Sequence, residues 1–240
     1  MTDYDVLAPF YDALNGEPDD IVAIIVDVLT RHHGEPRAVL ELGCGTGAVL
    51  AGLGSGVACT GIDVSAAMLE IAARRLPHAR LVRGDITDFR LDETFDVVLC
   101  VLDTLNHVTT VEGWRAVVTN AADHLDEDGL FLVDVHTLEG LRQLGETAPW
   151  AHDAEGHTLV IDVDNDPPLA RWHLRVFEHL GGDDFRRHHA TITELGVELE
   201  LVRAVLSERF EIVEESDQAG QRPDAASTRV FFAARRRNGA

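Results

Sequence analysis

Short apolar runs alternate with stretches of helical periodicity along most of the first 145 residues. Short apolar runs predict buried strands, whereas apolar residues spaced three and four apart predict amphipathic helices. The expected strands cover residues 38–42, 57–62, 80–82, 95–101 and 129–135. The expected helices cover residues 19–34, 47–53, 65–76, 111–125 and 138–144, with Asp19 or Asp20 capping the first and Ser65 the third. Apolar strands that alternate with helices predict a parallel sheet with right-handed crossovers.

The pattern changes after Pro149, where strand-like runs follow one another without intervening helices. Pro167-Pro168 and Gly181-Gly182-Asp183 separate three such runs and suit tight turns, so we expect an antiparallel meander. The three runs cover residues 157–163, 169–180 and 184–192, and a helix over 197–206 and strands over 210–214 and 228–234 follow them.

These elements predict a Rossmann-like α/β fold. We expect a seven-stranded, mostly parallel sheet with helices on both faces and an inserted antiparallel β-meander. The expected core domain comprises residues 1–148 and 191–240. Residues 149–190 are expected to form an inserted lid over the site where the acceptor substrate of a transfer reaction would bind. A chain of 240 residues is long enough for one such core and short for two independent domains.

A glycine-rich turn follows the first expected strand, in the run VLELGCGTG of residues 39–47. Gly43, Gly45 and Gly47 permit positive φ angles and allow a ligand to approach the backbone closely. The turn alone does not identify the ligand, because Gly43-x-Gly45-x-x-Ala48 also satisfies the fingerprint of nicotinamide-binding proteins.

Acidic residues near the turn favour a ligand that carries a ribose and a positive charge. Asp63 ends the next expected strand, twenty residues after Gly43, where a carboxylate can accept from both ribose hydroxyls. Glu41 precedes the glycines, which is unfavourable beside a phosphate and suitable beside a cation. Asp85 follows the third strand, where it can accept from an adenine amino group, and Met68 can pack on the adenine face.

The segments VLELGCGTG, GIDVSAAML, GDITDF and FDVVLC, in this order and spacing, resemble the class I S-adenosylmethionine (SAM)-dependent methyltransferases over residues 36–145. SAM carries a sulfonium and an ammonium and no phosphate, which agrees with the acidic turn. The resemblance implies that the glycines bracket the methionine portion, that the backbone of Cys100 holds the ammonium, and that Tyr4 or Tyr11 closes over the cofactor. The expected cofactor-binding residues are Tyr4, Tyr11, Glu41, Gly43, Cys44, Gly45, Gly47, Asp63, Val64, Met68, Asp85, Ile86 and Cys100.

Two further segments, LDTLNHV and LFLVDVHT, are similar to a small-molecule branch of this family that includes amino-sugar and glycine-type N-methyltransferases. This implies methyl transfer from SAM to nitrogen or oxygen of a small metabolite. The chain departs from the family in having Arg209-Phe210 before the penultimate strand, where Gly-Phe is usual. The alternatives are a non-catalytic SAM-binding protein and a nicotinamide-dependent oxidoreductase. Glu41, the third glycine and the missing lysine disfavour the oxidoreductase.

Candidate catalytic residues follow two of the expected strands. Substrate sites in open α/β sheets lie beyond the carboxyl ends of the strands. Asp103, Asn106 and His107 follow one strand, and His136 follows another. Because an imidazole titrates near neutral pH, we expect His136 or His107 to assist the transfer, to which positioning of the acceptor contributes most.

Composition narrows the possible partners and chemistries. The formal net charge is −22, and the one basic cluster is Arg235-Arg236-Arg237, so we expect no nucleic-acid partner. All twenty basic residues are arginine, which excludes a Schiff-base lysine and a Walker A lysine. Three scattered cysteines and the lack of a signal-peptide pattern or a long apolar run favour a cytoplasmic protein without a membrane span.

The twelve histidines do not indicate a metal site. His32-His33 and His188-His189 are adjacent pairs, and adjacent side chains do not converge on one ion. We therefore expect no metal ligands. The identity of the acceptor and the oligomeric state stay open.

Overall fold

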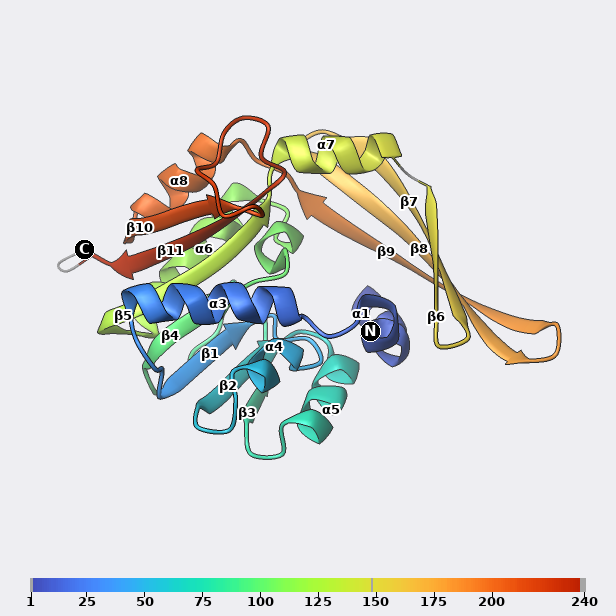
Figure 1. Cartoon of the computed structure of the whole chain (residues 1–240), viewed down its shortest axis with the longest axis horizontal. Helices are drawn as coiled ribbons and strands as arrows, with labels where there is room; N and C mark the ends of the chain where they lie inside the picture. Colours follow the sequence, from blue (N-terminus) through green and yellow to red (C-terminus); the bar gives the residue numbers. More distant parts are fainter. Residues whose placement is uncertain (1, 148, 238–240) are drawn as a thin grey trace.

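The computed structural model describes residues 2–147 and 149–237, which form two β-sheets with the first residues of the chain between them (Figure 1). The strands of the main sheet are β1 (Ala38–Leu42), β2 (Ala58–Asp63), β3 (Arg80–Arg83), β4 (Phe95–Cys100), β5 (Leu125–His136), β10 (Phe210–Asp217) and β11 (Arg229–Arg236). Their order is β10-β11-β5-β4-β1-β2-β3. Strand β11 runs antiparallel to both of its neighbours, and the other pairs are parallel. The predicted seven-stranded, mostly parallel sheet is confirmed.

Helices cover both faces of this sheet, as expected. They are α3 (Asp19–His32), α4 (Ala48–Gly52), α5 (Ala66–Arg75), α6 (Val111–Asp123) and α8 (Leu199–Ser207). Helix α7 (Leu138–Thr147) packs mainly against the second sheet, and a 3-10 turn, η2 (Thr104–His107), follows β4. None of the helices in the described residues combines the length and the apolarity that crossing a membrane requires.

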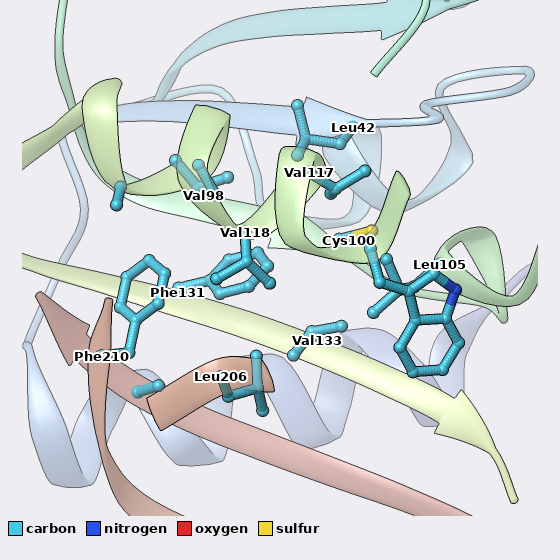
Figure 2. Close-up of a cluster of buried hydrophobic side chains, with 14 of the residues drawn as sticks. Leu42, Val98, Cys100, Leu105, Val117, Val118, Phe131, Val133, Leu206 and Phe210 are labelled. Atoms are coloured by element: carbon cyan, nitrogen blue, oxygen red, sulfur yellow. The ribbon is translucent and has the colours of Figure 1, made fainter. Parts of the chain in front are cut away.

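Each face of the main sheet carries its own apolar core. On one face, α6 and α8 pack against the strands, where Trp114, Phe131 and Phe210 are completely buried (Figure 2). On the other face, α3 and α4 contribute buried residues such as Ile25 and Leu50. Burying one side chain of this size stabilises the fold by about 1.5–3 kcal/mol. The cores hold the sheet rigidly and leave its carboxyl edge free for other contacts.

The starts of two helices test the predicted caps. Helix α5 begins as expected, because Ser65 Oγ accepts a hydrogen bond from the backbone N–H of Met68 at 3.2 Å. The cap predicted for α3 is wrong. Its N-cap position is Pro18, and Asp19 and Asp20 lie in the first turn, where their charges favour the positive end of the helix dipole.

The second sheet is the predicted antiparallel meander with one strand more than expected. Its strands, in spatial order, are β6 (Trp150–Ala154), β7 (His157–Asp166), β8 (Leu169–Gly181) and β9 (Asp184–Leu195). The sequence did not predict β6, because this edge strand is largely exposed and its residues do not alternate. Strand β9 ends three residues beyond the expected end of its run at residue 192, since Leu195 still pairs with Leu169.

Residues 2–18, here called the N-terminal segment, lie between the two sheets (Figure 1). They form helices α1 (Asp3–Leu7) and α2 (Tyr11–Asn15), joined by a 3-10 turn, η1 (Ala8–Phe10), none of which the sequence predicted. Leu7 and Phe10 join an apolar cluster with Leu159, Val176 and Ala190 on the inner face of the second sheet. The N-terminal segment is therefore part of the interior between the sheets.

The buried side chain of Asn106 ties the ends of the two sheets together. Its Nδ2 donates to the carbonyls of His136 at 2.9 Å and Leu195 at 2.8 Å, and its Oδ1 accepts from the N–H of His136 at 3.0 Å. His136 and Leu195 are the last residues of β5 and β9. One amide group thus fixes the second sheet at the carboxyl edge of the main sheet.

We expect Asn106→Leu to lower the free energy of unfolding by about 2–4 kcal/mol, because it leaves three buried backbone groups without partners. Urea unfolding measures this change. Gln221→Leu, in an exposed loop, is the matched control and should change the stability by less than about 0.5 kcal/mol. If Asn106→Leu lowered the free energy of unfolding by less than about 1 kcal/mol, the role of Asn106 in joining the two sheets would be contradicted.

Candidate functional site

The glycine turn between β1 and α4 has the backbone geometry that the sequence predicted. Gly43, Gly45 and Gly47 have φ angles of 71°, 52° and 74°, a region that other residues rarely adopt. A Cβ on Gly43 would lie 2.4 Å from Cγ2 of Thr104, so this position also excludes a side chain sterically. A Cβ on Gly45 would meet no atom within 4 Å. The turn therefore presents bare backbone toward an open space.

That space is a cavity of about 370 Å³ at the carboxyl edge of the main sheet, here called the first cavity. Eleven of the thirteen expected cofactor residues line it: Tyr4, Tyr11, Glu41, Gly43, Cys44, Gly45, Asp63, Val64, Met68, Asp85 and Ile86. Gly47 lies outside the lining, at the N-cap of α4. The side chain of Cys100 is buried in the core, and the next two residues, Val101 and Leu102, reach the cavity instead.

Two of the three carboxyl groups that line the first cavity, those of Glu41 and Asp63, lie beside the glycine turn. Asp63 accepts the backbone N–H groups of Gly45 and Ser65, each at 2.8 Å. Burial nevertheless raises the pKa of Asp63 above its usual value. Glu41 is 3% exposed, and its Oε2 has no hydrogen-bond partner among the described residues. Burial, together with the charge of Asp63, raises the pKa of Glu41. A cationic ligand would give this carboxyl the partner it lacks.

Aspartates anchor the N-terminal segment over the first cavity. Asp5 Oδ1 accepts from Ser65 Oγ at 2.6 Å, and hydrogen bonds lower the pKa of Asp5 to about 2. Asp12 accepts from Thr46 Oγ1 at 2.6 Å and from Arg75 at 3.0 Å. These contacts place Tyr4 and Tyr11 in the cavity wall. The sequence predicted the two tyrosines there but not the aspartates that anchor them.

A second cavity of about 850 Å³ lies between the N-terminal segment and the inner face of the second sheet. Its apolar wall includes Leu159, Ile161, Leu174 and Ile192 from strands β7 to β9. Five residues line both cavities: Tyr4, Tyr11, Ala48, Leu102 and His107. Ligands in the two cavities would therefore meet at these residues.

The structure places the two expected catalytic histidines differently. His107 lines both cavities, and its Nε2 lies 2.9 Å from the hydroxyl of Tyr4. His136 lines neither cavity. Its Nδ1 lies 3.2 Å from Glu194 Oε2, and its ring stacks on Trp172, which lines the second cavity. His107 thus borders the second cavity directly, and His136 borders it only through Glu194 and Trp172.

A buried charge network surrounds His136. Arg229 donates to Asp103, lies 3.2 Å from His136 Nε2, and its Nε lies 3.4 Å from Asp134 Oδ2. Burial, together with the charge of Asp103, raises the pKa of Asp134 to about 7. Burial opposes the charged form of His136, yet Glu194 and Asp103 outweigh it and raise the pKa of the imidazole.

Sequence reasoning identified Asp103 as a candidate and missed Glu194, Asp134 and Arg229. These three residues lie on β9, β5 and β11, and no local motif connects them. Atoms of Asp103, His136 and Glu194 lie within 4.8 Å of one another, a spacing that a metal ion accepts. Arg229 already supplies a positive charge to this group, and the absence of a metal stays a prediction.

Comparison with known proteins gives a match over the part of the chain that carries the glycine turn. Residues 39–129 match the methyltransferase domain family. Over 111 residues the chain is 37% identical to a dTDP-4-amino-2,3,4,6-tetradeoxy-D-glucose N,N-dimethyltransferase from Saccharopolyspora spinosa. That match covers 46% of this chain and 45% of the relative, so it spans less than half of either protein.

Two further similarities extend over the whole chain. A putative methyltransferase from Geobacillus sp. (strain WCH70) is 27% identical over 97% of this chain and 99% of its own length. The crystal structure of a SAM-dependent methyltransferase from Clostridium acetobutylicum superimposes with a TM-score of 0.86. It covers 97% of this chain and 98% of the other at 19% identity, which establishes a common fold.

Tyr4 and Tyr11 are the two tyrosines of the chain, so absorbance reports on this site directly. Burial raises the pKa of both phenols, that of Tyr11 to about 12. We expect the native protein to show little tyrosinate absorbance at about pH 10.5, where the chain unfolded in guanidinium titrates normally. The folded state retains protons that the unfolded state loses, so stability should fall as the pH rises from about 10 to 12. Coincident titration of the native and unfolded proteins would contradict this burial.

The glycine turn lies within the matched residues 39–129, and the strand order with its single antiparallel strand extends the likeness to the rest of the main sheet. They confirm the resemblance noted in the sequence. Residues 39–129 match the methyltransferase domain family, and the chain has the fold of a SAM-dependent methyltransferase of known structure.

Proposed function

We propose that this protein transfers a methyl group from SAM to an amine nitrogen of a small molecule. The observation that carries the proposal is the meeting of two cavities at Tyr4, Tyr11 and His107. Apart from Tyr4 and Tyr11, the first cavity is lined by residues that match the methyltransferase domain family, and the second has room for a small acceptor. The relative from Saccharopolyspora spinosa is named as an N,N-dimethyltransferase, which supports nitrogen as the acceptor atom.

The residues of the first cavity fit SAM. Glu41, the buried carboxyl without a partner, suits the positively charged methionine portion, and the open backbone of Gly45 lies beside it. Asp63 would bind the ribose hydroxyls, and Asp85 and Met68 the adenine, as the sequence predicts. When bound there, SAM supplies an electrophilic methyl carbon. The protein contributes position, exclusion of water and control of protons.

On the acceptor side, His107 and Tyr4 occupy the junction of the cavities. His107 Nδ1 is buried and has no hydrogen-bond partner among the described residues, so it is available to a polar group of the acceptor. His136 acts as a positioning residue, since it holds the carboxylate of Glu194 against the second cavity. An amine that is already neutral needs only this positioning, and a protonated amine must first release a proton to one of these groups.

The alternatives are less well supported. A nicotinamide cofactor carries a diphosphate, which the buried carboxyl of Glu41 would repel beside the glycine turn. A non-catalytic SAM-binding protein has no need for a second cavity that opens onto the first. The net charge of −22 supports a small acceptor over a nucleic acid.

The proposed function predicts SAM-dependent methylation of members of a panel of amines, amino sugars and phenols, followed by mass spectrometry. Asp63→Ala should weaken SAM binding by about 1.5–3 kcal/mol in calorimetry, because a charged hydrogen-bond acceptor is lost. Asp92→Ala, an exposed aspartate outside both cavities, is the control. Unchanged SAM affinity in a folded Asp63→Ala variant would remove Asp63 from the ribose site. Failure of the wild type to bind SAM would refute the function.

Replacement of the two histidines should separate their roles. If His107 accepts a proton, His107→Ala lowers turnover by roughly 10²–10⁴-fold. His136→Ala should chiefly raise the KM for the acceptor and shift the pH profile, because it releases Glu194. His152→Ala, on an exposed edge strand, is the control and should retain wild-type rates. Near-wild-type rates for both variants at every pH would leave positioning alone as the mechanism.

A further inference from the structure

The charges around the second cavity are strongly unequal. Among the residues that the structure describes, its lining contains six carboxyl groups and one guanidinium. The carboxyl groups are those of Asp12, Glu17, Asp19, Asp20, Asp103 and Glu194, and the guanidinium is that of Arg229. A wall of this composition attracts cations and repels anions, and the effect grows where the cavity excludes water.

Nearby arginines do not reverse this balance. Arg229 is committed to two carboxylates, since it donates to Asp103 and its Nε lies 3.4 Å from Asp134 Oδ2. Arg75 approaches the wall from outside and pairs with Asp12 at 3.0 Å and Glu17 at 3.1 Å. Both guanidiniums therefore already have two carboxylate partners each. Neither is free to bind a phosphate group of an acceptor.

Glu194 is the carboxylate best placed to meet an acceptor. Its side chain is 6% exposed and lines the second cavity, and Oε2 is oriented by His136. Aromatic rings of Tyr4, Tyr11 and Trp172 line the same cavity. Aromatic faces together with a desolvated carboxylate are a recognition site for ammonium groups, including methylated ones.

We infer that the acceptor is a cationic amine without a phosphate group, whose ammonium is held by Glu194 and the aromatic wall of the second cavity. This rests on the proposed function and narrows its substrate class. An amino sugar linked to a nucleoside diphosphate, such as the compound in the name of the Saccharopolyspora spinosa relative, carries two negative charges into a wall of carboxylates. A free amine or an amino glycoside carries none. Before transfer, the ammonium releases one proton to His107, which lines both cavities, and becomes a neutral amine.

The test compares two substrates that share the amino sugar and differ in the thymidine diphosphate group. One is dTDP-4-amino-2,3,4,6-tetradeoxy-D-glucose, and the other is the methyl glycoside of the same amino sugar. With SAM at saturation and low salt, kcat/KM for the glycoside should exceed that for the nucleotide sugar by about tenfold or more. Added salt should raise the KM for the glycoside and lower it for the nucleotide sugar, because screening weakens both attraction and repulsion.

A matched pair of variants tests the role of Glu194. Glu194→Gln preserves the size of the side chain and removes its charge, so the KM for the glycoside should rise about tenfold with unchanged affinity for S-adenosylhomocysteine. The control is Asp164→Asn. Asp164 lies on β7, its side chain is 73% exposed, and it lines neither cavity. This control should leave both constants unchanged.

The inference is overturned if the nucleotide sugar is the better substrate at low salt, or if Glu194→Gln leaves the KM for the glycoside unchanged. If neither compound is methylated, calorimetry with protein saturated with S-adenosylhomocysteine makes the same comparison. Tighter binding of the nucleotide sugar, or binding of neither compound, then overturns the inference. Failure of the wild type to bind S-adenosylhomocysteine would instead count against the proposed function.

Discussion

The common direction of β1, β2, β3, β4 and β5 is the constraint on which the rest of the molecule depends. Parallel strands bring all their carboxyl ends to one edge, so the loops that follow them meet there. The glycine turn after β1, Asp63 at the end of β2 and Asp85 after β3 thus share one cavity. Gly34 and Gly220 also have positive φ angles in turns, but they line neither cavity.

The antiparallel strand β11 and the second sheet add what a parallel sheet does not supply. Strand β11 brings Arg229 beside His136, its pairing partner on β5, and β9 brings Glu194 to the same place. The completely buried Asp134 depends on this arginine, because a buried carboxylate without a cation is strongly destabilising. Leu102 and Asp103 have φ angles of 58° and 61°, a strained conformation held by the contacts of this network.

Local sequence patterns made the main sheet and much of the first cavity predictable. The strand periodicity predicted the main sheet. Once a strand is known, a glycine or an acidic residue at its carboxyl end can be placed at the edge of the sheet, as for Gly45 and Asp63. Glu194 and Arg229 could not be found in this way. Each lies within or at the start of a strand whose pairing and register decide what it meets, and register depends on distant residues. The same holds for the N-terminal segment, whose short helices are stabilised by Leu7 and Phe10 against a sheet that follows more than 140 residues later.

The two cavities draw on different parts of the chain. Apart from Tyr4 and Tyr11, every residue of the first cavity lies between residues 41 and 108, whereas Leu159, Ile161, Leu174 and Ile192 line the second cavity alone. These four side chains belong to strands of the second sheet, whereas the glycine turn belongs to the main sheet. Under the proposed function, the first cavity can therefore stay constant through evolution while the second sheet diverges and new acceptors are acquired. For the engineer, the same separation makes these positions a compact target for libraries that alter acceptor choice and leave cofactor affinity intact.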